Sequence, residues 1–101
     1  MSGAAEDIMF SVQKTRTEKP IRLSAHAQAY LARRGFSIAE VEQAIRTTPW
    51  EPAERGKLQC RKDFAFTHTW NGRWYATKQV RPVFVEEVQE IVVVTVYTYY
   101  F

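Results

Sequence analysis

IVVVTVYTYYF, residues 91–101, consists almost entirely of β-branched and aromatic residues. Such residues favour strands, and apolar side chains at odd and even positions alike predict a strand covered on both faces. At about 3.3 Å per residue it would be roughly 30 Å long, enough to cross a small domain. An exposed edge strand of this kind would promote aggregation. We therefore expect a central strand, with Val92, Val94 and Val96 on one face and Ile91, Val93 and Tyr97 on the other.

The length and composition predict one globular domain. The chain has 101 residues, of which 46% are hydrophobic and 14% aromatic, and a chain of this length buries a modest core. The longest apolar run is shorter than the roughly 20 residues of a membrane-spanning helix, so we expect a soluble, cytoplasmic protein without membrane contacts. Residues 1–19 show no sustained period, which predicts a flexible N-terminal arm before a single domain at residues 20–101.

Two helix signals follow this arm. Ser24 is a favourable N-cap for a helix that ends before Gly35, a residue type common just past a helix C-terminus. Ser37 and Glu40 have the spacing of a capping box, in which each side chain binds a free backbone N–H of the other. This spacing predicts a second helix over about residues 38–47.

Strand signals dominate the rest of the chain. Polar and apolar residues alternate from Lys57 to Trp70, which indicates a half-buried strand. Asn71-Gly72 favours a two-residue hairpin turn because both residues accept positive φ. Pro82 interrupts the next strand, residues 73–85, and requires an edge, a bulge or a break there. Helices followed by strands predict an α+β domain: two N-terminal helices packed on one face of a three- to four-stranded antiparallel sheet.

Motifs for cofactors and metals are missing from the sequence. It has no P-loop, no GxSxG, no glycine-rich dinucleotide turn and no paired metal-ligand spacing, so we expect neither a cofactor nor a metal. Cys60 is the single cysteine and cannot form an internal disulfide. We expect it to be a small buried residue.

Candidate catalytic side chains lie on the first helix. At about 100° per residue, His26, Tyr30 and Arg33 share one edge of its apolar stripe. Arg34 projects along the centre of the stripe, so its charge should reach a carboxylate, a carbonyl or a bound phosphate. His26 lies in the first turn, where the helix dipole favours the neutral imidazole that a general base requires. The alternative is a histidine that packs against the sheet.

The basic residues concentrate in the middle of the chain. Residues 51–85 hold seven Lys and Arg against three acids, whereas residues 86–101 hold three acids and no base. Cations beside aromatic rings suit single-stranded nucleic acid. The candidate RNA-binding residues are Arg61, Lys62, Arg73, Lys78, Arg81 and Trp74. The alternatives are a solvated sheet face and aromatic packing within the hairpin.

Three short stretches carry a resemblance to a known family. Ser24-Ala25-His26-Ala27, Arg34-Gly35-Phe36-Ser37 and Val93-Val94-Thr95-Val96-Tyr97 resemble a bacterial and phage domain family of RelE/BrnT-like toxins. The resemblance spans about residues 20–97 and implies a compact RelE/barnase-like α+β fold. It also implies cleavage of mRNA, on the ribosome or free, and a cognate antitoxin. The matching positions are His26, Arg34, Thr95 and Tyr97, and we take His26, Arg34 and Tyr97 as candidate catalytic residues.

Two classes of function follow from these signals. The first is a toxin-like endoribonuclease that cleaves RNA without a metal: a base takes the 2′-OH proton, cations stabilise the charge and an acid protonates the leaving oxygen. The second is a non-catalytic protein- or nucleic-acid-binding module of phage or mobile-element origin that could form a homodimer. The strand face that ends in Thr95, Tyr97 and Tyr99 separates them. It forms the floor of a site if Arg34 and His26 reach it, and a dimer contact if they do not.

Overall fold

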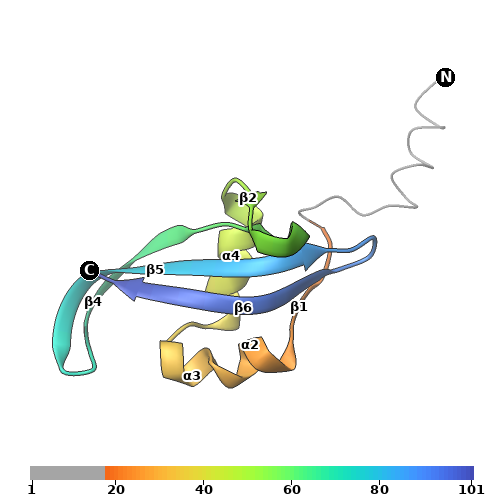
Figure 1. The fold of residues 1–101 in the computed structure, drawn as a ribbon. Helices are drawn as coiled ribbons and strands as arrows, with labels where there is room; N and C mark the ends of the chain where they lie inside the picture. Colours follow the sequence, from red (N-terminus) through yellow and green to blue (C-terminus); the bar gives the residue numbers. More distant parts are fainter. Residues whose placement is uncertain (1–17) are drawn as a thin grey trace.

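A six-stranded mixed sheet dominates the computed structural model, which describes residues 18–101 (Figure 1). Strands make up 48% of the structure. β6 (Ile91–Tyr100) pairs in parallel with β1 (Ile21–Leu23) and antiparallel with β5 (Arg73–Glu86). On its other side, β5 pairs with β4 (Lys62–Trp70) and then with β3 (Leu58–Gln59). The remaining strand, β2 (Glu51–Pro52), pairs with β3, and the short 3-10 helix η1 (Glu54–Gly56) connects the two.

The three α-helices of the described residues are short. α4 (Ile38–Thr47) packs on β5 and passes behind the sheet in Figure 1. α2 (Ala25–Ala29) and α3 (Leu31–Arg34) instead run beside β6, below the sheet in the same view. No helix of residues 18–101 combines the length and the apolar character needed to cross a membrane.

The predicted fold, two helices packed on one face of a three- to four-stranded antiparallel sheet, is therefore wrong. The residues after Pro20 form β1, and its parallel pairing with β6 depends on a contact across most of the chain. The segment with two prolines contributes β2. The predicted first helix divides at Tyr30, whose φ of −96° and ψ of 0° interrupt the helix, so it forms two short helices beside β6 and not one helix packed on the sheet face.

Local signals for caps and turns are confirmed. The Ser24 hydroxyl accepts a hydrogen bond from the Ala27 N–H at 3.1 Å. Ser37 and Glu40 form the predicted capping box, which fixes the start of α4. The turn between β4 and β5 is Asn71-Gly72, with φ values of 50° and 82°. These features depend on neighbours within four residues, so the sequence is sufficient to predict them.

A β-bulge in β6 changes which side chains face the core. Val83 pairs with Thr95, whereas the next residue, Phe84, pairs with Val93. The extra residue, Val94, reverses the alternation of side chains along the strand. Ile91, Val93 and Val96 are consequently all buried in one core, while Tyr97 is exposed. The predicted division of the two faces is wrong from Val96 onward.

The core lies between α4 and the sheet. Val41, Ala44 and Ile45 of α4 meet Val80 and Phe84 of β5, and all are nearly inaccessible to solvent. The same core contains the free thiol of Cys60, as predicted. The remaining members come from α2, the α3–α4 turn and the two strands beside them: Leu23, Ala27, Phe36, Ile91, Val93 and Val96.

Pro82 lies in β5 at a gap in the strand pairing on one side. β3 ends its pairing at Val83 and β4 begins at Val80, so Arg81 and Pro82 have no paired residue on that side. The Cys60 N–H donates to the Pro82 carbonyl at 3.3 Å across this gap. Of the three options that the sequence left open, a break into two strands does not occur, because β5 continues through Pro82 as one strand. The gap in pairing on the side of β3 and β4 accommodates the missing N–H of proline.

Lys19, just before β1, anchors the chain to the turn between β5 and β6. Lys19 is 8% exposed, and its ammonium group lies 2.9 Å from the Glu86 carboxylate and 2.8 Å from the Glu87 carbonyl oxygen. It was expected in the flexible arm, but it is fixed to the turn between β5 and β6. Residues 1–17 of that predicted arm lie outside the described residues.

Candidate nucleic-acid interface

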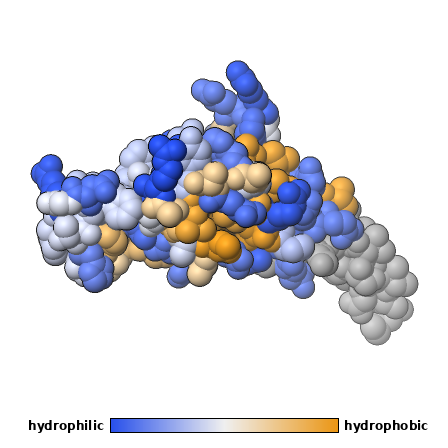
Figure 2. Space-filling model, turned by 90° about the horizontal axis from the view of Figure 1, so that it is seen from below, coloured by the Kyte–Doolittle hydropathy of each residue, from blue (hydrophilic) through white to orange (hydrophobic). Residues whose placement is uncertain are grey.

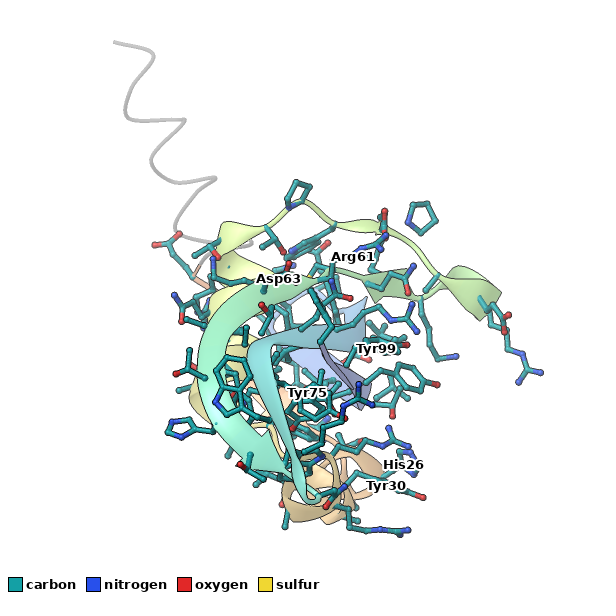
Figure 3. The ribbon with its side chains drawn as sticks, turned by 90° about the vertical axis from the view of Figure 1, so that its left-hand side faces the viewer. His26, Tyr30, Arg61, Asp63, Tyr75 and Tyr99 are labelled. Atoms are coloured by element: carbon teal, nitrogen blue, oxygen red, sulfur yellow. The ribbon has the colours of Figure 1, made fainter. Side chains whose placement is uncertain are left out.

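The face of the sheet opposite α4 exposes aromatic and basic side chains. Arg81 of β5 is paired with Tyr97 of β6, and Gln79 with Tyr99. The two tyrosines are 38% and 42% exposed, so their rings are available to a ligand. Figure 3 shows Tyr99 on the same side of the molecule as His26 and Tyr30.

Rings and guanidinium groups alternate in a row across this face. The first helix contributes two rings in contact, since the His26 and Tyr30 ring centres lie 4.8 Å apart with their planes tilted by 51°. The Arg34 guanidinium follows, 4.0 Å from the Tyr30 ring centre and 5.2 Å from that of Tyr97. The Arg81 guanidinium lies 4.9 Å from Tyr97 and 5.4 Å from Tyr99, within the range of cation–π attraction. We call this row the tyrosine–arginine ladder: His26, Tyr30, Arg34, Tyr97, Arg81 and Tyr99.

Arg34 holds α3 against the edge of β6. Its Nη1 donates to the Val96 carbonyl at 2.8 Å and to the Thr95 hydroxyl at 3.3 Å. In return, its own carbonyl accepts hydrogen bonds from the hydroxyls of Thr98 and Tyr100, at 2.6 and 2.8 Å. The first contact satisfies the Val96 carbonyl at the edge of β6, and the hydroxyls satisfy the Arg34 carbonyl at the end of α3. Of the partners expected for Arg34, the structure supplies a carbonyl.

The three candidate catalytic residues all belong to the ladder. Arg34 contacts the Tyr97 ring directly, and His26 joins them through Tyr30. His26 itself is exposed, so the alternative of a histidine buried against the sheet does not apply. Arg34 reaches the strand face that ends in Thr95, Tyr97 and Tyr99, whereas His26 connects to it only through Tyr30. The condition for a site there, that both residues reach this face, is therefore met by Arg34 alone.

A pocket of about 760 Å³ adjoins the ladder. One wall comes from η1 and the segments beside it, which lie in front of β5 in Figure 1, and the other from β5 and β6. Within the described chain, Nε of Arg81 is buried and has no hydrogen-bond partner. The lining residues are Pro52, Ala53, Glu54, Arg55, Lys57, Gln59, Arg81, Val83, Val94, Thr95 and Tyr97.

Lys78 was predicted to bind RNA, and its position contradicts this. It is 8% exposed, and its Nζ lies 2.9 Å from the Gly35 carbonyl oxygen and 2.8 Å from the Glu40 carboxylate. Lys62 is paired with Val80, a core residue, and therefore also points to the α4 side of the sheet. The alternation of β5 places Arg81 on the opposite face, so the predicted cations do not form one surface.

The other predicted RNA-binding residues lie away from the ladder's centre. Arg61 is exposed and forms an ion pair with Glu51 at 2.8 Å. Arg73 lies near the hairpin tip, with its guanidinium 5.7 Å from the Tyr75 ring. Trp74 is 60% exposed, so its indole is accessible to a base.

The other hairpin aromatics pack together. Trp70 stacks on Tyr100 at 5.1 Å, and Phe66 and Tyr75 contact the same ring at 5.2 and 5.6 Å. Burial raises the pKa of Tyr100 above its ordinary value. The hairpin-packing alternative therefore holds for Trp70 and Tyr75 but not for Trp74.

Two residues beside this face were not among the predicted site residues: Arg55 and Lys57, which line the pocket. Tyr99, by contrast, is expected on this face from the two-residue period of the strand. Arg55 has a φ of 57° inside η1. No local sequence pattern predicts this turn or the direction in which its side chains point. No group of three or more His, Cys, Asp and Glu within residues 18–101 is arranged to hold a metal ion.

No protein-family model, curated protein or solved structure matches this chain. The resemblance to RelE/BrnT-like toxins therefore stays a prediction. A function for the chain depends on the chemistry of the site itself.

Proposed function

We propose that the tyrosine–arginine ladder binds single-stranded RNA. The observation that carries the proposal is the alternation of exposed Tyr97 and Tyr99 rings with the guanidinium groups of Arg34 and Arg81. Bases stack on aromatic faces and on guanidinium planes, while phosphates pair with the charge. A single strand exposes its bases for stacking, which a duplex does not.

The exposure of the ladder distinguishes it from ordinary packing. The rings around Tyr100 fill the space between the hairpin and α3, whereas Tyr97 and Tyr99 keep about two fifths of their surface in solvent. Arg33 adds a further cation, 5.1 Å from the Tyr30 ring. Holding exposed rings and cations together costs side-chain entropy. A ligand that contacts both the rings and the cations would offset this cost.

The test is fluorescence anisotropy with a labelled single-stranded RNA of about 12 nucleotides, within the usual range of single-strand sites. Tyr97→Ala and Arg81→Gln should each weaken binding about tenfold or more, since stacking of one base contributes about 1–3 kcal/mol. Arg61→Gln is the matched control, because Arg61 is an exposed cation outside the ladder, and it should change the affinity about twofold at most. Equal losses in the three variants, or no binding by the unmodified protein, would refute the proposal.

We further propose that the ladder cleaves the bound RNA without a metal, as a toxin-like endoribonuclease. The juxtaposition of His26, Arg34 and Tyr97 supports this. In this mechanism His26 takes the proton of a 2′-OH, the oxygen attacks the adjacent phosphorus, and the bond to the 5′-oxygen breaks. Arg34 stabilises the extra negative charge, and the Tyr97 hydroxyl protonates the leaving oxygen. A cognate antitoxin that covers the ladder, and action in the cytoplasm, complete this proposal.

Cleavage is tested with labelled RNA in the presence of a metal chelator. The unmodified protein should cut the RNA and leave a 2′,3′-cyclic phosphate, and His26→Ala should lower the rate about 100-fold or more. Gln28→Ala is the control for a helix-surface change in the same segment. If the RNA is bound but stays intact, the protein is a non-catalytic binding module, and the cleavage proposal fails while the binding proposal stands.

A further inference from the structure

The pocket beside the ladder has the size of a small-ligand site. Its volume of about 760 Å³ lies within the roughly 300–1,000 Å³ of small-molecule pockets. Its two walls come from segments distant in sequence, residues 52–59 and the middle of β5 and β6. A site of this size holds one nucleotide and not a stretch of RNA.

The charge of the lining favours an anion. Three cations, Arg55, Lys57 and Arg81, face one carboxylate, that of Glu54, so the lining has a net charge of 3 − 1 = +2. Nε of Arg81 is buried and lacks a hydrogen-bond acceptor in the described residues. A buried donor without a partner costs free energy, and a phosphate oxygen is an acceptor that matches the geometry and charge of a guanidinium group.

The rest of the lining favours a nucleoside over a bare anion. Tyr97 contributes an aromatic ring to the pocket, and Val83 and Val94 contribute apolar surface beside it. Thr95 and Gln59 add polar side chains of the kind that bind the edges of bases and the ribose hydroxyls. Cations on one part of the lining and an aromatic ring on another match the two halves of a nucleotide.

We infer that this pocket binds a single nucleoside monophosphate unit, free or as the terminal nucleotide of an RNA. Its phosphate pairs with Arg81, Arg55 and Lys57, and its base stacks on Tyr97. The inference deepens the proposed function and rests on it in part, because Arg81 and Tyr97 belong to both the pocket and the ladder. Arg55 and Lys57 belong to the pocket alone, and this separates the two experimentally.

The experiment titrates isotopically labelled protein with adenosine and uridine 5′-monophosphate, followed by NMR. Each nucleotide should bind at least about tenfold more tightly than the matching nucleoside or inorganic phosphate. The double variant Arg55→Gln, Lys57→Gln should weaken nucleotide binding at least about tenfold. Arg61→Gln is the matched control, since Arg61 pairs with Glu51 and does not line the pocket, and it should leave nucleotide affinity unchanged.

The outcomes distinguish the pocket from the ladder. Failure of both nucleotides to bind, while single-stranded RNA binds, overturns the inference and leaves the proposed function intact. Nucleotide binding without RNA binding overturns the proposed function and supports the pocket. Equal affinity for nucleotide and inorganic phosphate overturns the nucleoside part of the inference. An RNA with a 5′-phosphate that binds more tightly than its unphosphorylated counterpart, with the difference lost in the double variant, supports the terminal nucleotide as the occupant.

Discussion

Gly35 fixes the position of the ladder through its backbone conformation. It has a φ of 76° and lies directly after Arg34, where the chain turns from α3 toward α4. A Cβ atom at this position would lie 2.6 Å from Cη2 of Trp70 and would also collide with the Tyr100 hydroxyl. Tyr100 in turn donates to the Arg34 carbonyl. The small size of Gly35 therefore allows the close contact that holds Arg34 beside β6.

We predict that Gly35→Ala lowers the free energy of unfolding by about 2–4 kcal/mol. The positive φ accounts for about 1 kcal/mol, and the collision with Trp70 and Tyr100 for about 1–3 kcal/mol. Gly72→Ala is the matched control, since Gly72 also has a positive φ of 82° but no atom within 4 Å of the added methyl group, and it should lose only about 1 kcal/mol. Urea unfolding followed by far-UV circular dichroism measures both. Equal losses would show that crowding at Gly35 contributes nothing.

Cys60 should react with alkylating reagents only when the protein unfolds. Burial shields the thiol from the reagent and raises its pKa above the ordinary value. The shielding limits access, and the raised pKa lowers the amount of reactive thiolate. Because the folded-state pKa is the higher one, this group contributes stability that is complete below the ordinary cysteine pKa of about 8.5 and is lost as the pH rises through the raised value. Labelling with iodoacetamide near pH 8 should be about 100-fold slower in the native protein than in denaturant.

Two variants check the Cys60 prediction. Val88→Cys in a Cys60→Ala background puts the thiol at a position that is 65% exposed, and it should react as fast as a small thiol. Cys60→Ala should show a shallower loss of stability above about pH 8.5 than the unmodified protein. Rapid labelling of the native unmodified protein would contradict the burial of Cys60.

At the scale of elements, Lys78 joins the start of α4 to the middle of β5. One carboxylate, that of Glu40, both accepts a hydrogen bond from the Ser37 N–H at 2.9 Å and pairs with Lys78 at 2.8 Å. The Lys78 side chain is 10% exposed and that of Glu40 22%. The helix cap and the ion pair therefore stabilise each other, and the position of α4 on the sheet depends on both.

We predict that Lys78→Met lowers the free energy of unfolding by about 2–4 kcal/mol. Removing one partner of a buried pair costs about 3–5 kcal/mol, and partial exposure of Glu40 reduces that cost through solvent screening. Arg61→Met is the control: its pair with Glu51 has side chains 55% and 44% exposed, so the loss should stay below about 1 kcal/mol. RNA affinity of the folded Lys78→Met protein should be unchanged. A large fall in RNA affinity would show that Lys78 does contribute to RNA binding.

The elements that the sequence predicts are those whose signals are local. The capping box set α4, and Asn71-Gly72 set the hairpin, because each depends on a few adjacent residues. The pairing of β1 with β6 depends on residues that are about 70 positions apart, and no periodicity encodes it. The position of Lys78 was predicted wrongly because a charged residue in a strand is usually exposed, and its partner Glu40 belongs to a different element.

The candidate site was predicted in part for the same reason. Helical spacing placed His26 and Tyr30 together, and the apolar environment of Arg34 required a partner. The sequence predicted that this partner would be a carboxylate, a carbonyl or a phosphate, and the structure shows the carbonyl of Val96. The bulge at Val94 determines that Tyr97 faces the ladder and the pocket. A bulge leaves no composition signal in a run of β-branched residues, so the pocket could not be predicted.

The two faces of the whole molecule differ in what covers them. One face receives α4 and forms the core, while the other presents the ladder and the pocket. Figure 2 views the molecule from the side of α2 and α3, and apolar side chains gather there toward the middle, with mainly hydrophilic or neutral ones at the end of the β4–β5 hairpin.

Salt dependence of RNA binding tests the whole basic surface at once. Neutralising one phosphate of a single strand contributes about −0.7 to the slope of log K against log salt. The ladder and pocket hold four cations that form no ion pair in the described chain: Arg34, Arg81, Arg55 and Lys57. If each binds one phosphate, the slope should be about −2.8, measured by anisotropy between about 50 and 200 mM salt. Arg55→Gln should reduce it by about 0.7, whereas Arg61→Gln should leave it unchanged. A slope near zero would mean that stacking alone holds the RNA. Equal changes of the slope in Arg55→Gln and Arg61→Gln would mean that the charge of the whole surface, and not that of the pocket, attracts the RNA.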